Sequence, residues 1–256
     1  MSLPVFIHPG LGSSQAGQPV YLSGAEGRHA VTVKRIHPGE RINLIDGTGA
    51  TATVTVTKTS GKDQLTGTIE SVEILPAPSP RVVVVQAIPK AERSELAIDL
   101  ATQAGADEII AWQADRCVAK WDGKKIPKAV AKWEAAAQSA AKQARRSRIP
   151  AIRGPLTTKQ LAQELTGAIS GPESNGRAPA AALVLHEDAT ESMREVSLDA
   201  ETIYLIVGPE GGIGEDELAT LRGAGSQAIK LGPEVLRTAS AAMVALAAIG
   251  VRTSRW

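Results

Sequence analysis

Ile203-Tyr-Leu-Ile-Val-Gly-Pro-Glu-Gly-Gly-Ile-Gly-Glu-Asp-Glu-Leu218 is the stretch that decides the fold of the larger part of this chain. Its apolar run 203–207 shows no polar alternation, which is typical of a strand buried on both faces. Four glycines follow, where backbone can approach a ligand without side-chain obstruction. Three acidic residues, 215–217, then open a helix whose positive end they complement. Strand, glycine turn and helix together predict a nucleotide-type site.

A second stretch, Ile229-Lys-Leu-Gly-Pro-Glu-Val-Leu-Arg-Thr-Ala-Ser-Ala-Ala-Met243, repeats this design. It predicts a short strand over 228–231, a turn at Gly232-Pro233 and an alanine-rich helix that Thr238 or Ser240 caps. Neither stretch has the glycine spacing of a dinucleotide fold or of a phosphate loop, and no lysine follows the first turn. The two turns therefore predict one ligand pocket without a phosphate cradle.

Strands and helices alternate from residue 82 onward, which predicts a parallel sheet with helices on both faces. The expected helices span 92–104, 128–146, 158–165, 215–222 and 238–251. The expected strands span 82–85, 108–113, 151–152, 181–186, 203–207 and 228–231.

The first 75 residues are different, because they are strand-like with turns at Asp46-Gly-Thr-Gly49 and Ser60-Gly-Lys-Asp63. Residues 51–58 alternate at period two, and only 26–36 looks helical. A small β-barrel is the economical interpretation. Three prolines within 75–81 indicate a stiff connector. We therefore expect a barrel domain over 1–75, a linker over 76–81 and a second domain over 82–256.

Composition favours a soluble globular protein of 256 residues, with 43% hydrophobic residues. No apolar run is long enough for a membrane span and the amino terminus lacks a signal-like pattern, so we expect a cytoplasmic location. The single cysteine, Cys117, excludes an intramolecular disulfide and predicts a buried thiol in a strand-like setting. The four histidines have no ligand spacing, and we expect no metal site.

Charge is unevenly distributed although the formal net charge is only +1. A segment between residues 120 and 153 is strongly basic, while 187–201 is predominantly acidic. A basic stripe on a nearly neutral protein indicates a polyanionic partner. The basic residues of this segment are Lys120, Lys124, Lys125, Lys128, Lys132, Lys142, Arg145, Arg146, Arg148 and Arg153.

Gly208-Pro-Glu-Gly-Gly212 followed by Leu231-Gly-Pro-Glu-Val-Leu-Arg-Thr238 resembles the signature of the RsmE family of SPOUT-class RNA methyltransferases. Residues 27–39 and 45–49 are similar to that family's PUA-like domain. The resemblance implies a SPOUT fold with a carboxyl-terminal trefoil knot, preceded by a PUA-like β-barrel. It implies methyl transfer from S-adenosylmethionine (SAM) to N3 of a uridine in 16S rRNA of the small ribosomal subunit, and a homodimer. Ala239 and Gln103 depart from the family, which usually has glutamate at both positions.

The resemblance also implies where ligands bind. Arg237 is our candidate for stabilising the deprotonated uracil, and Glu210 is either a proton acceptor or an organiser of the glycine turn. The candidate SAM-binding residues are Leu185, His186, Gly208, Pro209, Glu210, Gly211, Gly212, Leu231, Gly232, Leu236, Arg237 and Thr238. The candidate RNA-binding residues are Arg28, His29, Lys34, Arg35, Lys90, Arg93, Arg116, Gln143 and Arg146. Surface ion pairs are the alternative explanation for the arginines.

Two other functions remain open from the sequence. A SPOUT enzyme that methylates a ribose 2'-hydroxyl would share the Gly-Pro-Glu-Gly-Gly turn, and a non-catalytic RNA-binding protein would tolerate Ala239. The apolar helix 239–249 fits a dimer seam and fits core packing equally.

Overall fold

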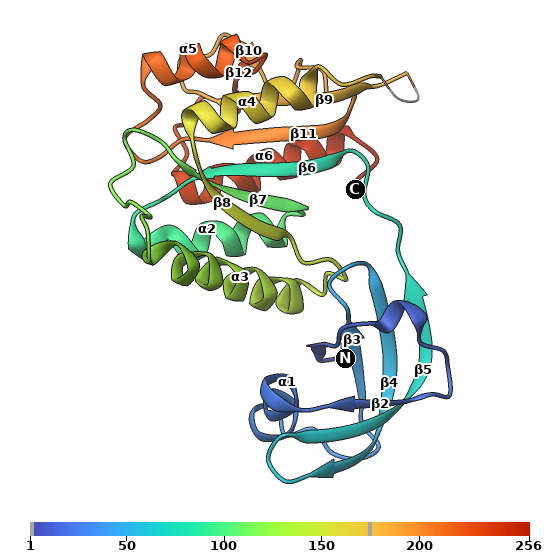
Figure 1. The fold of residues 1–256 in the computed structure, drawn as a ribbon. Helices are drawn as coiled ribbons and strands as arrows, with labels where there is room; N and C mark the ends of the chain where they lie inside the picture. Colours follow the sequence, from blue (N-terminus) through green and yellow to red (C-terminus); the bar gives the residue numbers. More distant parts are fainter. Residues whose placement is uncertain (1–2, 174–175) are drawn as a thin grey trace. The chain divides into compact units, whose positions relative to one another are not determined.

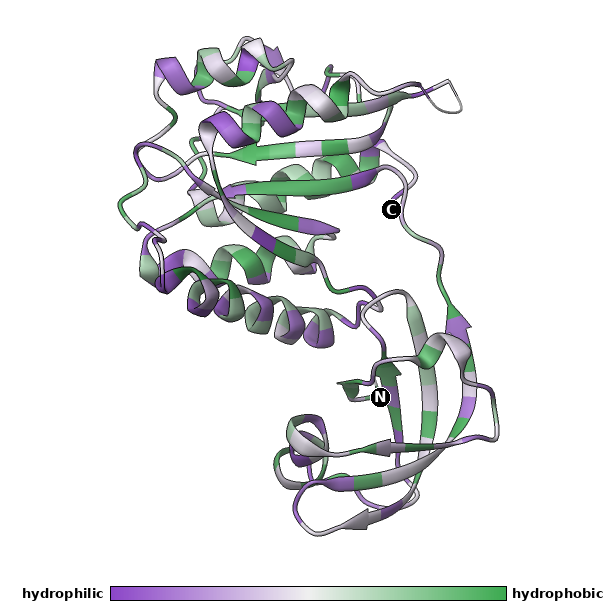
Figure 2. Ribbon diagram, in the orientation of Figure 1, coloured by the Kyte–Doolittle hydropathy of each residue, from purple (hydrophilic) through white to green (hydrophobic). Residues whose placement is uncertain are grey.

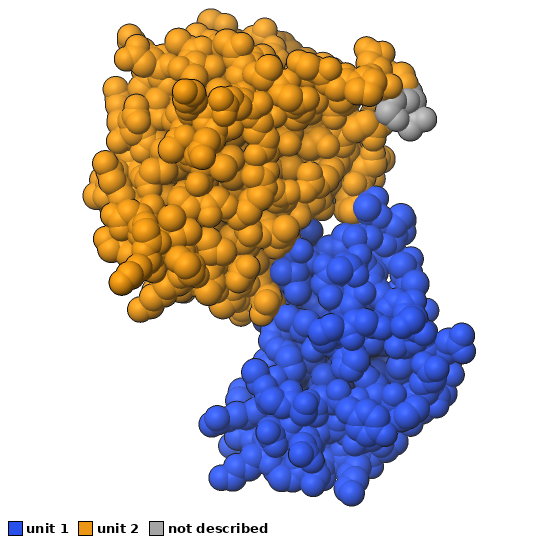
Figure 3. All heavy atoms as spheres, in the orientation of Figure 1, with its two compact units in different colours: residues 1–77, 141–149 blue, residues 78–140, 150–256 orange. Residues whose placement is uncertain are grey.

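The computed structural model describes residues 3–173 and 176–256, which form two compact units (Figures 1 and 3). The first unit comprises residues up to 77 together with 141–149, and the second comprises 78–140 and 150–256. The first unit therefore includes nine residues from the middle of the sequence, 141–149.

The first unit is built on a five-stranded sheet with the order β1-β3-β4-β5-β2. β1 and β3 are parallel, and the other neighbours are antiparallel. Among the described residues β1 and β2 are the two edges, so the small β-barrel expected from the sequence takes the form of a half-barrel sheet. The strands are β1 (Val5–Ile7), β2 (Pro19–Leu22), β3 (Arg41–Ile45), β4 (Ala50–Ser60) and β5 (Gln64–Ile74).

The alternation predicted for 51–58 is confirmed, because Ala52, Val54 and Val56 of β4 are buried in the core of this unit. The helix predicted over 26–36 is shorter. It consists of α1 (Gly24–Arg28) and a π-helical turn (His29–Val33), and it ends before Arg35, whose φ of 55° lies in the left-handed region.

The second unit contains a seven-stranded sheet in which every neighbouring pair is parallel, as the sequence predicted. Figure 2 shows that its central strands are predominantly hydrophobic. The sheet order is β10 (Glu191–Ser192), β12 (Gln227–Lys230), β9 (Ala178–Leu185), β11 (Ala200–Val207), β6 (Arg81–Ala87), β7 (Glu108–Gln113) and β8 (Ala151–Thr157).

Helices cover both faces of this sheet (Figure 1). α2 (Ala91–Gln103) packs against α6 (Thr238–Arg252), and α6 also contacts β6 and β11. α4 (Thr158–Ile169) packs against α5 (Glu215–Gly223) and contacts β7, β8 and β9. The remaining long helix is α3 (Lys125–Ala144). None of the helices within 3–173 and 176–256 combines the length and apolar character that a bilayer span requires.

Two local predictions were wrong. β8 has seven residues rather than two, and it includes Gly154 and Pro155, which are tolerated in an edge strand. The two-residue β10 was not predicted. Neither Thr238 nor Ser240 caps α6, whose N-cap is Arg237 without a side-chain hydrogen bond.

The order of the strands reverses at the neighbouring pair β6 and β11. From β6 it proceeds through β7 to β8 on one side, whereas β11, β9, β12 and β10 occupy the other side. In open parallel sheets such a reversal of strand order creates a crevice at the carboxyl ends of the strands, where ligands bind. The trefoil knot stays a prediction.

Candidate active site

Three loops predicted to bind SAM follow the carboxyl ends of neighbouring strands, and this end of the sheet is called the sheet edge below. β12, β9 and β11 are parallel neighbours, so the segments that follow Lys230, Leu185 and Val207 emerge side by side. The backbone N–H of His186 donates to the carbonyl of Ile229 at 3.0 Å. The sheet topology thus brings the predicted loops together.

The glycine turn after β11 is tightly constructed. Gly212 alone among its four glycines has a positive φ, of 71°, and its N–H donates to the Pro209 carbonyl at 3.0 Å. A Cβ on Gly208 would lie 2.7 Å from Cγ1 of Ile213. The turn's own geometry therefore requires Gly208 and Gly212.

Gly232, in the turn after β12, has no such structural need. Its φ is outside the left-handed region, and a Cβ there would meet only the end of the Glu234 side chain, at 3.6 Å. Leu231 and Leu236 in the same loop are partly buried. Because the fold itself would accept a side chain at this position, the bare backbone of Gly232 suits a loop that lies against a ligand.

Glu210 links the glycine turn to the amino terminus of α2. Its Oε1 accepts a hydrogen bond from the backbone N–H of Lys90, the N-cap of α2, at 3.0 Å. Of the two roles considered for Glu210, this contact corresponds to the organiser of the turn.

Arg116 also contacts this turn. Its Nη1 donates to the Gly211 carbonyl at 3.2 Å, and a Cβ on Gly211 would lie 3.3 Å from the Arg116 Cβ. Lys90 and Arg116, both predicted to bind RNA, therefore contact the predicted SAM loop. Arg93 is one helical turn from Lys90 and donates its N–H to the Lys90 carbonyl at 2.9 Å.

The guanidinium of Arg237 is exposed and makes no hydrogen bond or ion pair with any residue that the structure describes. Only its backbone is engaged, since its carbonyl accepts from the Ser240 and Ala241 N–H groups at 2.9 and 3.0 Å. The next residue, Thr238, is buried and donates its hydroxyl to the Gly208 carbonyl at 2.5 Å. Arg237 thus combines a backbone held by hydrogen bonds with a guanidinium that is unpaired among the described residues.

A buried carboxylate that the sequence analysis did not single out supports this edge. Glu217, in the first turn of α5, is only 3% exposed. Its Oε1 accepts the Asp115 N–H at 3.0 Å and the Thr158 hydroxyl at 2.5 Å, and the indole of Trp112 donates to the same hydroxyl at 3.1 Å. Glu217 was predicted only to complement the helix end, and nothing in its sequence signals these distant partners.

Six of the nine RNA-binding candidates belong to the first unit: Arg28, His29, Lys34, Arg35, Gln143 and Arg146. Lys142 joins the two segments that contain them, because its Nζ lies 2.7 Å from Oε1 of Glu26. The His29 ring is partly buried and packs edge-on against Phe6, with ring centroids 5.5 Å apart. Burial lowers the pKa of His29, and the Lys142 charge lowers it further.

Cys117 is buried, as predicted, but it lies in the turn after β7 rather than in a strand. Its N–H donates to the Ala114 carbonyl at 3.1 Å, which closes that turn. Burial raises the pKa of the thiol to about 11, so it is protonated at neutral pH. Within the described ranges, no group of three or more histidine, cysteine or acidic residues could hold a metal ion.

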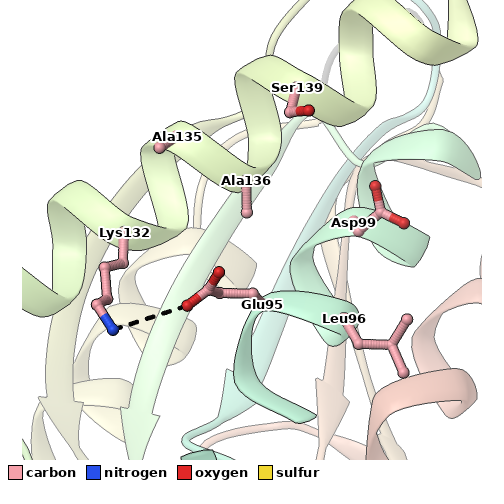
Figure 4. Close-up of a pocket in the computed structure, with 7 residues that line it drawn as sticks. All are labelled: Glu95, Leu96, Asp99, Lys132, Ala135, Ala136 and Ser139. Carbon is pink, nitrogen blue, oxygen red and sulfur yellow. Dashed lines mark ion pairs between the residues drawn. The ribbon is translucent and has the colours of Figure 1, made fainter. Parts of the chain in front are cut away.

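A hollow of about 680 Å³ lies elsewhere, between α2 and α3 (Figure 4). It is lined by Glu95, Leu96, Asp99, Lys132, Ala135, Ala136 and Ser139. Glu95 and Lys132 form an exposed ion pair across it at 3.8 Å, a contact that contributes little free energy. None of the predicted site residues lines this hollow.

Comparison with known proteins shows the family of this chain. Residues 76–250 match the model of an RNA methyltransferase domain, and residues 22–70 match an RNA methyltransferase PUA domain. Ribosomal RNA small subunit methyltransferase E of Mycobacterium tuberculosis is 49% identical over 241 residues, covering 94% of this chain and 89% of the relative. The Bacillus subtilis protein of that name is 30% identical, covering 91% and 90%. The chain belongs to the ribosomal RNA small subunit methyltransferase E family.

A solved member of this fold carries the cofactor. The structure of a Legionella pneumophila methyltransferase with bound SAM is 29% identical, has a TM-score of 0.84 and covers 98% of each chain. The expected family, the PUA domain and the methyltransferase fold are thus confirmed. The two departures from the family sequence lie in different environments, since Ala239 is buried in α6, whereas Gln103 is exposed and donates to Asp99 at 2.8 Å.

Proposed function

We propose that this chain transfers a methyl group from SAM to N3 of one uridine in 16S rRNA of the small ribosomal subunit. As a member of the family, the chain is an rRNA methyltransferase. The observation that carries the proposal is the convergence of the Gly208–Gly212 turn and the Leu231–Thr238 loop at one sheet edge.

The residues at this edge fit SAM. When bound, SAM supplies a methyl group on a sulfonium, which is already activated for transfer. Backbone from the loops after β9, β11 and β12 lines the edge, and Leu231 and Leu236 provide apolar walls for a flat adenine. The open backbone at Gly232 leaves room for the ligand. The hydroxyl of Thr238 holds the two loops together rather than remaining free for the ligand.

Arg237 and Glu210 are the proposed catalytic residues. N3 of uracil must lose its proton before it attacks, and the negative charge then spreads to O2 and O4. The guanidinium of Arg237, which has no partner within 3–173 and 176–256, can stabilise that charge, an effect worth about two to three orders of magnitude in rate in enzyme sites. Glu210 holds the turn through Lys90 and is the carboxylate available to accept the proton.

Basic residues of both units are proposed to hold the RNA. A base inside a duplex cannot reach such a site, so the target uridine is single-stranded or flipped out. Lys90, Arg93 and Arg116 lie beside the proposed SAM loops and would fix the target nucleotide. The six candidates of the first unit would bind phosphates along the RNA.

A homodimer in the cytoplasm is the proposed assembly and location. The outer side of α6 exposes Met243, Val244 and Val251 at 39%, 43% and 71%, which favours a seam with a second copy. A monomer in sedimentation at micromolar concentration would contradict this assembly.

The decisive test uses labelled SAM and small ribosomal subunits from a strain that lacks this gene. After incubation with the protein, the RNA is digested and the modified nucleoside is identified by mass spectrometry. Label in 3-methyluridine is the expected result. Label in a 2'-O-methylated nucleoside would place the protein among ribose-modifying enzymes. SAM binding without label in any nucleoside would contradict the proposed substrate, and absence of SAM binding would favour the non-catalytic alternative.

A further inference from the structure

Gln86 is a polar residue at the end of an otherwise apolar buried strand. It follows Val82–Val85 in β6, the strand beside the reversal of strand order, and it is only 1% exposed. In register it pairs with Val207, the last residue before the glycine turn. Its Oε1 is buried without a hydrogen-bond partner among the described residues. Such an unpaired buried acceptor is unfavourable for folding, so stability alone does not explain the amide.

The amide of Gln86 is linked to two of the three proposed SAM loops by two hydrogen bonds in series. Its Nε2 donates to the Thr238 hydroxyl at 3.1 Å and to the Ala87 carbonyl at 3.0 Å. The Thr238 hydroxyl donates in turn to the Gly208 carbonyl at 2.5 Å. These bonds connect β6, the beginning of the glycine turn and the first residue of α6.

The direction of the two bonds follows from proton counting. A carbonyl oxygen can only accept, so the single proton of the Thr238 hydroxyl is committed to Gly208. The hydroxyl oxygen then requires a donor, and the nitrogen of Gln86 provides it. A residue of the same shape that only accepts would compete with Gly208 for that one proton.

We propose that Gln86 is a positioning residue for SAM, which acts through Thr238 to hold the Gly208 and Arg237–Thr238 backbones in the geometry that binds the cofactor. The inference rests on the proposed function. Gln86 itself need not touch the ligand, because it fixes groups that do. Supporting residues of this kind determine whether a site is preorganised or loose.

The test compares Q86E with the wild type by calorimetric titration of SAM and by thermal unfolding. At pH 8 the carboxylate that Q86E introduces cannot donate to Thr238, and we expect the Kd for SAM to rise at least about tenfold. Burial at this position should raise the pKa of the carboxyl group well above the ordinary value of about 4.3, so lowering the pH to 5.5 should protonate it and restore a donor. Part of the affinity should then return in Q86E and not in the wild type. A merely structural role would lower the Tm of Q86E while leaving the affinity of the folded protein and its pH dependence unchanged.

Further variants keep the test decisive if Q86E does not fold. T238V removes the hydroxyl and should also weaken SAM binding about tenfold, whereas T238S keeps the hydroxyl and should bind within about threefold of the wild type. T253V is the matched control, since the Thr253 hydroxyl donates to the Ile249 carbonyl at 2.8 Å at the other end of α6. T253V should bind SAM normally.

The outcomes separate the two proposals. If the wild type binds SAM while Q86E and T238V bind it within twofold, the positioning role is wrong and the proposed function stands. A wild-type chain that does not bind SAM would overturn the proposed function, and with it the ligand assigned to this edge.

Discussion

The Glu217 carboxylate accepts a hydrogen bond from the Asp115 backbone N–H at 3.0 Å, and it thereby ties the first turn of α5 to the loop after β7. The next residue in that loop is Arg116, whose guanidinium donates to the glycine turn. A buried carboxylate thus supports the loop that braces the proposed SAM site.

Replacing this carboxylate should destabilise the protein. E217A leaves the Asp115 N–H and the Thr158 hydroxyl without their acceptor, and we expect unfolding to become easier by about 2 to 3 kcal/mol. The measurement is chemical denaturation at pH 7. E215A is the control, because Glu215 is an exposed residue of the same helical turn. Equal midpoints for the two variants would refute the supporting role.

Gly232→Ala should separate ligand binding from stability. The position has neither a positive φ nor crowding, so the variant should fold with an unchanged or slightly higher Tm. The added methyl group would lie where the ligand packs, and SAM affinity should fall about tenfold or more, as measured by calorimetry. G208A is the contrasting variant, because its Cβ would clash with Ile213 and lower the Tm. Unchanged SAM affinity in G232A would contradict the proposed pocket.

Arg237→Ala should affect catalysis without affecting folding. The guanidinium has no partner among the described residues, so the free energy of unfolding should change by less than about 0.5 kcal/mol. Loss of the cation should lower kcat by about 10²- to 10³-fold in the methyl-transfer assay with small subunits. R222A, at an exposed position of α5, is the control. Equal kcat values for R237A and the wild type would exclude the assigned role.

Asp46 should make the stability of the first unit depend on acidic pH. Burial raises the pKa of the Asp46 carboxyl. Hydrogen bonds from the Thr48 hydroxyl and from the Thr48, Ala50 and Gly49 N–H groups lower this pKa by more than burial raises it, so the net pKa lies below the ordinary value for aspartate. A group whose folded-state pKa is depressed stabilises the protein above its unfolded pKa, about 3.9, and loses that contribution as the pH falls below it. Wild-type stability should therefore decrease between about pH 5 and pH 2, more than that of D46N.

At pH 7, D46N should be less stable than the wild type by about 1 to 2 kcal/mol, since an amide accepts these bonds more weakly. Denaturant unfolding followed across the pH range provides the comparison. E73Q is the control, because Glu73 is an exposed carboxylate of the same unit. Parallel pH profiles for D46N and the wild type would show that Asp46 is not responsible.

Lys34→Ala should weaken RNA binding in a salt-dependent manner. Lys34 is exposed at the end of the π-helical turn. Removing one phosphate contact should reduce the slope of log affinity against log salt by about 0.7 to 0.9, with little effect on Tm. The measurement is a filter-binding titration of 16S rRNA at several salt concentrations. An unchanged slope, equal to that of the exposed control K58A, would remove Lys34 from the RNA surface.

The pattern of apolar residues predicted the long strands and helices of the second unit, because such a pattern can be recognised from the residues of each segment alone. Glu108–Gln113, for example, was predicted with the observed bounds. β8 was predicted too short, and the observed strand includes Gly154 and Pro155, which only an outer strand of a sheet accepts readily. The place of a strand in its sheet is a tertiary property, which local sequence does not contain.

The loops of the candidate site were predictable because glycine-rich turns follow buried strands. Their supports were not predictable. Gln86 and Thr238 are separated by 152 positions, and Glu217 and Asp115 by 102, so no window of sequence indicates that these polar groups meet. The sequence analysis predicted the apolar strand 82–85 and did not single out Gln86, the residue that follows it. Why the family's glutamates are replaced by Ala239 and Gln103 is not explained by any contact in the structure.

The residues 141–149 that complete the first unit impose an order of events during synthesis. Glu26 finds its partner in Lys142, and the Leu75 carbonyl accepts from Arg148 at 2.8 Å. A nascent chain that has emerged only to residue 77 contains every strand of the half-barrel and lacks both of these contacts. The amino-terminal unit therefore becomes complete only after residues 141–149, which lie within the methyltransferase sequence, have left the ribosome.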